Sequence, residues 1–457
     1  MKPKVNESIF RPNDIRGIYG KDLTDDIAEK IGKGFGTLLG ERKNVVVGRD
    51  VRLSSKSLRN SLIRGLTSTG CNVVDIGIVT TPAFYFSLYF YKFDGGIMIT
   101  ASHNPPEWNG FHIYKGIKSL IVGEGMDKLK EKIEKEEFRK AKIMGKVKKL
   151  NILKDYMGFI SSKIKIKKKL KIAVDCSNGC AALIIPKLLE KLRQRAVVLN
   201  AKTDGKFPAH GPNVEEENLK ELKKVVKETK ADFGVCYDGD ADRAAFVDEK
   251  GRAMSGDKVA VIILEKIFKK KNCPKILDEV SCSSVLEKYI RSKATLKTSR
   301  RGHAFLQQMM RKENIDFGFE KSSHFYFQEL NGFDDAVFAT LKVAEVLSES
   351  GKSFSQIVDS ITWPPSKEEA LNCKDEIKLK VVENVKKEIH KLGFKTNELD
   401  GIKAFTENGW FLIRASITEP VIRIVVEAKD KKTLKEILSF ARKLVKKEIN
   451  ICLDKVN

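Results

Sequence analysis

The sequence predicts an α/β fold made of three related mixed α/β domains, followed by a smaller α+β domain. From residue 45 to residue 319, short apolar strands alternate with helices, which is typical of α/β units. This alternation restarts twice after charged or polar stretches. After Trp363-Pro-Pro, three strands instead follow one another closely between two helices, as in an α+β domain.

The elements of each domain follow from hydrophobic periodicity. Strands are expected at 45–48, 71–76 and 96–99 with helices at 54–68 and 82–91, and then strands at 171–175, 196–199 and 232–237 with helices at 181–192 and from 215. The third domain should contain a helix near 257 and strands at 275–280 and 317–319; the tail should contain a helix at 381–392, strands at 401–405, 410–414 and 421–427, and a helix from about 432. The predicted domains are 1–150, 151–255, 256–365 and 366–457.

The composition indicates a folded protein with a basic surface. Of 457 residues 42% are hydrophobic, and neither a membrane span nor a signal peptide is predicted, so a cytoplasmic location is expected. The net charge of +24 is compatible with a nucleic-acid partner. Because the sequence has no nucleic-acid-binding motif, a lysine-rich surface around a site for anionic substrates is favoured, with no nucleic-acid or membrane partner. The eight cysteines are expected to be reduced, buried thiols.

A serine follows the strand at 96–99, in T-A-S-H-N-P-P-E-W-N-G-F (100–111). The carboxyl end of a strand is where α/β sheets bind ligands, and we expect Ser102 to be exposed there. Ser102 and His103 do not indicate a hydrolase, because G-x-S-x-G is absent and adjacent residues of a strand-like segment point apart. A serine that carries a phosphoryl group beside a metal ion fits better. Pro105 and Pro106 would stiffen the turn.

Three aspartates alternate in D-G-D-A-D-R, which contains Asp238, Asp240, Asp242 and Arg243. Carboxylates at this spacing in a turn can converge on one divalent cation that prefers oxygen ligands. An EF-hand loop is excluded because Arg243 stands where that loop needs glycine, and because both flanks have the pattern of strands. The sequence therefore predicts a metal-binding turn between two strands.

Two further loops give weaker signals. F-E-K-S-S-H (319–324) follows an apolar strand, and its Glu, Ser and His side chains could bond sugar hydroxyls, although a polar loop without this role is nearly as consistent. R-A-S-I-T-E-P (414–420) lies between two strands of the tail, and its arginine and two hydroxyls suit a phosphate. A surface turn with an incidental arginine explains this second segment equally well.

In this order and spacing, the four loops resemble the phosphoserine, magnesium, sugar and phosphate loops of the α-D-phosphohexomutases, which include phosphomannomutase/phosphoglucomutase. F-R-P-N-D-I-R-G (10–17) and V-G-R-D-V-R-L-S-S (47–55) also resemble segments of that family's first domain. The resemblance covers nearly the whole chain. It implies three related α/β domains and a TATA-box-binding-protein-like fourth domain around a central cleft.

The resemblance also implies an activity on mannose and glucose phosphates. Phosphorylated Ser102 would transfer its phosphoryl group to a hexose monophosphate, and a hexose 1,6-bisphosphate, which also serves as activator, would turn around and return its other phosphoryl group. Ser102, Asp238, Asp240 and Asp242 would hold Mg²⁺. The resemblance implies two more groups of site residues: Arg16, His103 and Arg243 for catalysis, and His303, Glu320, Ser322, His324, Arg414, Ser416 and Thr418 for binding the phosphosugar.

The chain departs from the family pattern at four positions. His112 replaces a common lysine, Ser323 a glycine, Ile417 an asparagine and Asn13 a tyrosine. The E-K-S form of the sugar loop resembles the mannose/glucose branch more than the glucosamine branch. The alternatives are a phosphoglucosamine mutase or a catalytically weak sugar-phosphate-binding paralogue, and the sequence leaves the oligomeric state open.

Overall fold

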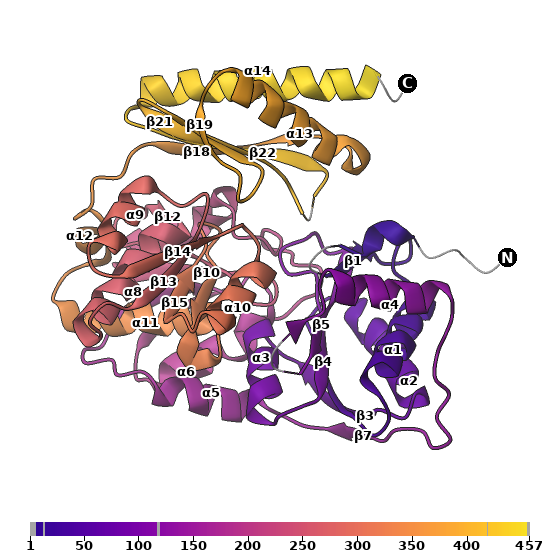
Figure 1. The fold of residues 1–457 in the computed structure, drawn as a ribbon. Helices are drawn as coiled ribbons and strands as arrows, with labels where there is room; N and C mark the ends of the chain where they lie inside the picture. The colour runs from indigo at the N-terminus through magenta and orange to yellow at the C-terminus, as the bar shows by residue number, and fades with distance from the viewer. Residues whose placement is uncertain (1–5, 12–13, 117–118, 418, 455–457) are drawn as a thin grey trace. The chain divides into compact units, whose positions relative to one another are not determined.

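The computed structural model describes residues 6–11, 14–116, 119–417 and 419–454. The chain forms two compact units (Figure 1). The larger unit contains residues 1–271 and 307–358, and the smaller unit contains residues 272–306 and 359–457. In the described part of the chain, no helix is both long and apolar enough to span a bilayer.

The amino-terminal part of the larger unit is a sheet with helices packed on it. Its elements are η1 (Glu7–Ile9), β1 (Ile15–Ile18), α1 (Asp25–Leu39), β2 (Asn44–Arg49), α2 (Ser55–Ser68), β3 (Asn72–Ile78), α3 (Thr81–Phe90), β4 (Gly95–Ile99), β5 (Trp108–Lys115), β6 (Ser119–Leu120), α4 (Glu124–Glu134) and β7 (Val147–Lys149). The strand order is β1-β5-β4-β2-β3-β7, and β2 runs parallel to both β3 and β4. Apolar residues of α1, α2 and α4 share one core with this sheet, drawn in indigo and purple in Figure 1. The carboxyl ends of β2 and β4 therefore meet at one edge of the sheet.

A second sheet follows in the same unit. Its elements are α5 (Leu153–Ser162), β8 (Lys171–Asp175), η2 (Cys180–Leu183), α6 (Ile185–Lys191), β9 (Arg195–Leu199), η3 (Glu216–Leu219), α7 (Lys220–Thr229), β10 (Phe233–Tyr237), β11 (Ala244–Asp248) and β12 (Ala253–Met254). The strand order is β12-β11-β10-β8-β9, and β10 and β11 form an antiparallel hairpin. The single helix expected at 181–192 is wrong: a 3-10 turn and α6 are separated at Ile184, because a proline occupies the first turn of α6.

The rest of the larger unit supplies the loop predicted to bind sugar. Its elements are α8 (Gly256–Lys270), β15 (Phe317–Phe319), β16 (Phe325–Phe327), η4 (Gln328–Leu330), β17 (Phe333–Asp334), α11 (Ala336–Ser350) and α12 (Phe354–Val358). β16 pairs antiparallel with both β15 and β17, so that 320–324 form a tight connection between paired strands. Asp335 caps α11 by accepting a hydrogen bond from the Phe338 N–H at 2.7 Å.

The smaller unit contains the carboxyl-terminal α+β domain. Its elements are β13 (Lys275–Glu279), α9 (Ser284–Arg291), β14 (Thr295–Ser299), β18 (Ser366–Asn372), α13 (Asp375–Lys391), β19 (Lys395–Asn397), β20 (Ile402–Thr406), β21 (Gly409–Ala415), β22 (Val421–Ala428) and α14 (Lys431–Asp454); α10 (His303–Lys312) begins in this unit. The antiparallel sheet has the order β18-β22-β21-β20-β19, and α13 and α14 pack on one face of it (Figure 1). The mixed α/β sheets, followed by this antiparallel sheet with helices on one face, confirm the predicted fold class. The polar strand β18 was not predicted.

Candidate active site

Ser102 lies just beyond the end of β4, in a tight turn. Its φ is +47°, in the left-handed region that few residues other than glycine adopt. Thr100 Oγ1 accepts a hydrogen bond from the Ser102 N–H at 2.9 Å, which closes the turn. Ser102 is only 1% exposed. The expectation of an exposed serine is therefore wrong, because another loop lies against it.

Arg52, beyond the end of β2, organises the backbone of this turn. Its two terminal nitrogens donate to four carbonyl oxygens: those of Ser102 (2.8 Å), Asn104 (2.6 Å), Pro105 (2.5 Å) and Trp108 (3.1 Å). Its Nε donates to Asp50 Oδ2 at 3.0 Å, and both side chains are fully buried. All five N–H groups of the guanidinium are used. The turn is therefore held by an arginine from a neighbouring strand end, in addition to its prolines.

The loop 238–243 connects β10 and β11, as the sequence predicted. Asp238, Asp240 and Asp242 are buried, and one carboxylate oxygen of each lies within 4.8 Å of the other two. Ser102 Oγ donates a hydrogen bond to Asp238 Oδ2 at 2.7 Å, so the serine turn and the aspartate loop meet. Gly239 permits this approach, because a Cβ at that position would lie 2.7 Å from the Ser102 carbonyl oxygen.

The three carboxylates fit a divalent cation. Asp240 Oδ2 accepts hydrogen bonds from Thr81 Oγ1 (2.6 Å) and Thr100 Oγ1 (2.9 Å), while Asp240 Oδ1 and Asp242 Oδ1 have no hydrogen-bond partner among the described residues. Burial and the charge of Asp238 raise the pKa of Asp240 to about 6, and they raise the pKa of Asp242 well above its usual range. A cation would offset this cost of holding several negative charges together. An all-oxygen donor set is the one that Mg²⁺ prefers.

Two arginines and a histidine lie around the serine. Arg243 Nε is 3.8 Å from Asp242 Oδ1. His103 Nδ1 is 3.3 Å from Ser102 Oγ, which contradicts the expectation that these side chains point apart. The left-handed φ of Ser102 removes the strand-like alternation on which that expectation depended. Burial, and then the charges of Arg243 and Arg16, lower the pKa of His103 well below its ordinary value, so the imidazole is neutral.

Arg16 reaches the serine turn from β1. Its guanidinium donates to Asn104 Oδ1 at 2.6 Å and to Asp14 Oδ2 at 2.6 Å. His112, in the adjacent strand β5, has its Nε2 3.3 Å from both Arg16 Nη2 and Asp14 Oδ2. This network holds the Arg16 guanidinium beside the turn, and it contains His112, one of the four departures from the family pattern noted in the sequence.

Glu320 and Ser322, predicted to bind sugar, lie on the connection between β15 and β16. Glu320 Oε1 accepts a hydrogen bond from Tyr326 OH at 2.5 Å, and Glu320 Oε2 accepts one from Ser322 Oγ at 3.4 Å. Ser323 has a φ of +71°, which explains why a glycine would suit this position. The tyrosine fixes the carboxylate and leaves it able to accept further hydrogen bonds.

His324, from the same loop, lies against the aspartate loop. Its Nδ1 is 2.8 Å from Asp334 Oδ2, and a ligand atom of each of His324, Asp334 and Asp242 lies within 4.8 Å of the others. Gln307 Nε2 donates to Asp334 Oδ1 at 2.8 Å. The structure therefore brings the sugar loop, the aspartate loop and the serine turn together within the larger unit.

The other predicted site residues belong to the smaller unit. Arg414 in β21 and Ser416 beyond it are both buried, and Arg414 Nε donates to Asp400 Oδ2 at 2.8 Å. His303 is the first residue of α10 and is partly buried. Thr418 lies outside the described residues. The role of these four residues in binding phosphate or sugar stays a prediction.

The residues of the site that were not predicted include Asp14, Asp50, Arg52 and Asn104. Asp50 and Arg52 belong to G-R-D-V-R, a segment noted only for its resemblance, and Asn104 follows Ser102 and His103 in the serine motif. All four are buried polar residues. A polar residue just after an apolar strand was the only sequence signal for Asp50, Arg52 and Asn104, and it does not identify their partners.

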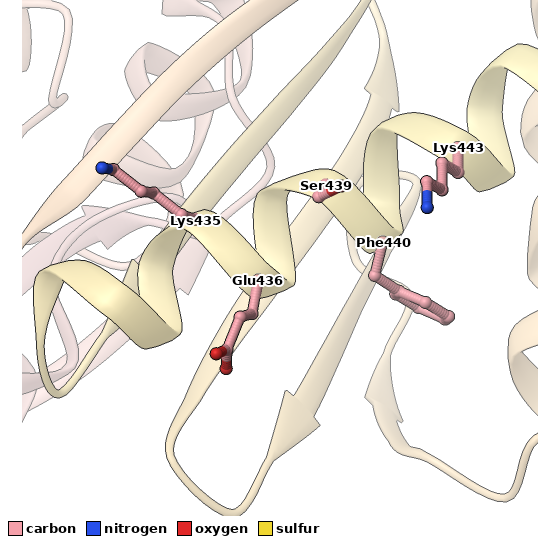
Figure 2. A pocket seen from close by; sticks show the side chains of 5 residues that line it. All are labelled: Lys435, Glu436, Ser439, Phe440 and Lys443. Atoms are coloured by element: carbon pink, nitrogen blue, oxygen red, sulfur yellow. The ribbon is translucent and has the colours of Figure 1, made fainter.

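A pocket on α14 belongs to the smaller unit. Its lining consists of side chains from this one helix (Figure 2): Lys435, Glu436, Ser439, Phe440 and Lys443. The Phe440 ring packs 5.8 Å from the Phe411 ring, centroid to centroid, at the edge of the domain core. None of the predicted site residues lines this pocket.

Models of one protein family match the chain in four consecutive parts. Those of the phosphoglucomutase/phosphomannomutase α/β/α domains I, II and III match residues 7–140, 154–251 and 255–363, and that of the C-terminal domain matches residues 368–444. The protein is therefore a mutase, an intramolecular phosphotransferase. It belongs to the phosphoglucomutase/phosphomannomutase family, which confirms the resemblance seen in the sequence.

Curated relatives align over almost the whole chain. A phosphoglucomutase/phosphomannomutase of Thermococcus kodakarensis is 36% identical over 452 residues, covering 96% of this chain and 99% of the relative. A phosphomannomutase of Methanocaldococcus jannaschii is 35% identical, with 96% and 98% covered. A probable phosphoglucosamine mutase of Methanosarcina acetivorans is 33% identical, with 96% and 99% covered.

Solved structures share the fold. A phosphoglucomutase/phosphomannomutase family protein of Burkholderia thailandensis superposes with a TM-score of 0.88 at 28% identity, covering 97% of this chain and 98% of that one. An Aspergillus fumigatus N-acetylphosphoglucosamine mutase, in complex with GlcNAc-6P and magnesium, superposes with a TM-score of 0.60 at 14% identity, covering 98% and 100%. At that identity the second structure supports the fold alone.

Proposed function

We propose that this protein interconverts the 6-phosphates and 1-phosphates of mannose and glucose through phosphorylated Ser102 and a hexose 1,6-bisphosphate. The observation that carries the proposal is the 2.7 Å hydrogen bond between Ser102 Oγ and Asp238 Oδ2, at the edge of a cluster of three buried carboxylates. A nucleophilic oxygen, a cation site and fixed positive charges are the parts that phosphoryl transfer requires.

The transfer exchanges one P–O bond for another. A sugar hydroxyl oxygen attacks the phosphorus held on Ser102 Oγ, the Oγ–P bond breaks, and the hydroxyl proton must leave the sugar. In an in-line transfer the attacking oxygen and Ser102 Oγ lie on opposite sides of the phosphorus. His103, whose Nδ1 lies 3.3 Å from Ser102 Oγ, is therefore placed to exchange a proton with the serine oxygen, which takes up a proton as the Oγ–P bond breaks and gives it up in the reverse step. After the bisphosphate turns around, the same steps run in reverse and Ser102 regains a phosphoryl group.

Two groups of residues would offset the negative charge on the phosphoryl oxygens. Asp238, Asp240 and Asp242 would hold Mg²⁺, which supplies Lewis-acid stabilisation of the transferring phosphoryl group when bound. Arg16 and Arg243 contribute fixed positive charge that needs no reorganisation during the reaction.

The bisphosphate must bind in two orientations. Glu320, held by Tyr326, can accept hydrogen bonds from neighbouring sugar hydroxyls in either orientation, with Ser322 beside it. Arg414, Ser416 and Thr418 would bind the phosphate that is not reacting, with His303 as a further contact, because an arginine fork matches phosphate oxygens. The ion pair of Arg414 with Asp400 would orient the guanidinium without neutralising the whole fork.

One other sugar phosphate is a candidate for the preferred substrate. Relatives similar to this chain include both phosphomannomutases and probable phosphoglucosamine mutases, so glucosamine phosphate is the alternative substrate. The E-K-S sugar loop favours mannose and glucose. Turnover of mannose 1-phosphate, glucose 1-phosphate and glucosamine 1-phosphate should be compared at equal enzyme concentration with the matching 1,6-bisphosphate. A larger kcat/KM for glucosamine 1-phosphate would reverse the assignment.

The role of Ser102 is tested by mass and by turnover. Incubation with glucose 1,6-bisphosphate should add one phosphate that maps to Ser102, and Ser102→Ala should neither gain it nor turn over substrate. Normal turnover by Ser102→Ala would refute the proposal. Binding of sugar phosphate without turnover by the wild-type protein would instead indicate a catalytically weak sugar-phosphate-binding protein.

A further inference from the structure

A second cluster of metal-ligating side chains lies in the second sheet of the larger unit: Asp175, His210 and Cys236. One ligand atom of each lies within 4.8 Å of the other two. Asp175 and Cys236 are buried, and the His210 side chain is 12% exposed. This cluster contains a thiol and an imidazole, and so its donor set differs from that of the all-carboxylate loop.

The sheet register places the first two residues side by side. β8 and β10 are parallel, and Asp175 is the direct register partner of Cys236. Partners in a parallel pair project from the same face, so the carboxylate and the thiol are lateral neighbours. Ala173 and Cys236 belong to one apolar core on that face. The cluster therefore lies at the carboxyl end of the sheet, where that core ends.

His210, from the segment after β9, completes the cluster. Its Nε2 lies 3.1 Å from Asp175 Oδ2. Asp175 Oδ1 is fixed separately, because it accepts hydrogen bonds from the Ser177 N–H (2.9 Å) and Asn200 Nδ2 (3.0 Å). Because these hydrogen bonds prevent the carboxylate from rotating freely, its Oδ2 stays directed at the imidazole. Metal ligands are commonly held in this way by neighbouring groups.

We propose that Asp175, His210 and Cys236 form a second cation site, selective for a thiophilic divalent ion such as Zn²⁺ or Co²⁺. In a tetrahedral zinc site the ligand atoms lie about 3.3–3.6 Å apart, as follows from Zn–N, Zn–O and Zn–S bonds of about 2.0–2.3 Å. His210 Nε2 and Asp175 Oδ2, 3.1 Å apart, are already close to that separation, whereas Cys236 Sγ, within 4.8 Å of both, would move toward them when an ion binds. Thiolate and imidazole ligands disfavour Mg²⁺, so the two sites would not compete for one ion.

A bound ion would join the ends of β8 and β10 directly before the aspartate loop. Cys236 is separated from Asp238 by Tyr237 alone. We expect Zn²⁺ to raise the melting temperature in the presence of excess Mg²⁺, because an ion that binds only the folded chain stabilises it. This effect is independent of the mutase activity, so it can fail without affecting the proposed function.

Cobalt absorption separates the two sites, since only a thiolate ligand gives sulfur-to-cobalt charge-transfer absorption in the near ultraviolet. Full-length protein, treated with chelator and returned to excess Mg²⁺, is titrated with Co²⁺. The band should saturate at one Co²⁺ per chain, disappear in Cys236→Ser, and persist in Cys176→Ser, a matched control at a buried thiol outside the cluster. His210→Gln should weaken Co²⁺ binding at least about tenfold.

No band in the wild-type protein, or an equal band in Cys236→Ser, would overturn the proposal and leave His210 and Asp175 as an ion pair only. If Cys236→Ser does not fold, as judged by circular dichroism, His210→Gln decides the question at a partly exposed position. Unchanged cobalt affinity in His210→Gln would then refute the site.

Discussion

Replacement of Arg52 by lysine should unfold or loosen the serine turn although the positive charge is kept. The guanidinium uses five N–H groups on five acceptors, namely Asp50 Oδ2 and four backbone carbonyls. A lysine ammonium has three N–H groups, so at least two of these buried acceptors lose their donor. Each unsatisfied buried acceptor costs about 1–3 kcal/mol, which gives a destabilisation of about 2–6 kcal/mol.

Urea denaturation of Arg52→Lys measures this change, with Arg64→Lys as the matched control. Arg64 is also an arginine near the amino-terminal sheet, but its side chain is 60% exposed and it pairs with Glu29, so its replacement should cost less than about 1 kcal/mol. Hydrogen exchange of peptides covering 100–111 should increase in Arg52→Lys alone. A destabilisation below about 1 kcal/mol, with unchanged exchange in that segment, would refute the reasoning.

Three further changes test other parts of the site and fold. Gly239→Ala should lower turnover about 10- to 100-fold, because the added Cβ would lie 2.7 Å from a carbonyl oxygen of the serine turn. Gly158→Ala is the control: a Cβ there has no atom within 4 Å, so this variant should keep wild-type turnover. Equal rates for the two variants would count against the close approach of the two loops. Burial raises the pKa of Asp335 to about 7, so between about pH 4 and pH 7 the folded chain retains a proton that the unfolded chain releases, and stability falls as pH rises. Asp335→Asn should remove up to about 4 kcal/mol of this dependence in urea denaturation at several pH values, and an unchanged slope would contradict it. Tyr326→Phe removes the donor to Glu320 and should raise KM several-fold with a smaller change in kcat; steady-state kinetics with a fall in kcat alone would instead assign the pair to the chemical step.

The aspartate loop could be predicted because its signals are local. Apolar strands on both sides predict the hairpin, and the alternating acids at 238–242 predict that the carboxylates lie close together. The helix expected at 381–392 begins earlier, at Asp375, because its first turn carries acidic residues that stabilise a helix amino terminus but do not extend the apolar stripe. Local periodicity therefore predicts which helices and strands form, but not the residues at which they begin and end.

The surroundings of Ser102 could not be predicted in the same way. A positive φ at a serine has no sequence signature, and it determines both the burial of Ser102 and its contact with His103. Arg52 resembles any arginine near a strand end, and the carbonyls that it reaches are set by the parallel order of β2 and β4. Such contacts depend on tertiary packing, which a single sequence does not encode locally.

Phosphorylation of Ser102 would reverse the polarity of its contact with Asp238. The hydroxyl now donates a hydrogen bond to the carboxylate, whereas a phosphoryl group brings negative charge and oxygens that only accept hydrogen bonds. The modified serine and the buried acid would then repel one another unless a cation lies between them. Cation affinity and retention of the phosphoryl group are therefore thermodynamically linked, and each must strengthen the other by the same factor. Removal of the cation should consequently lower the fraction of protein that is phosphorylated at equilibrium with a hexose 1,6-bisphosphate, which donates the phosphoryl group, and the hexose monophosphate that remains.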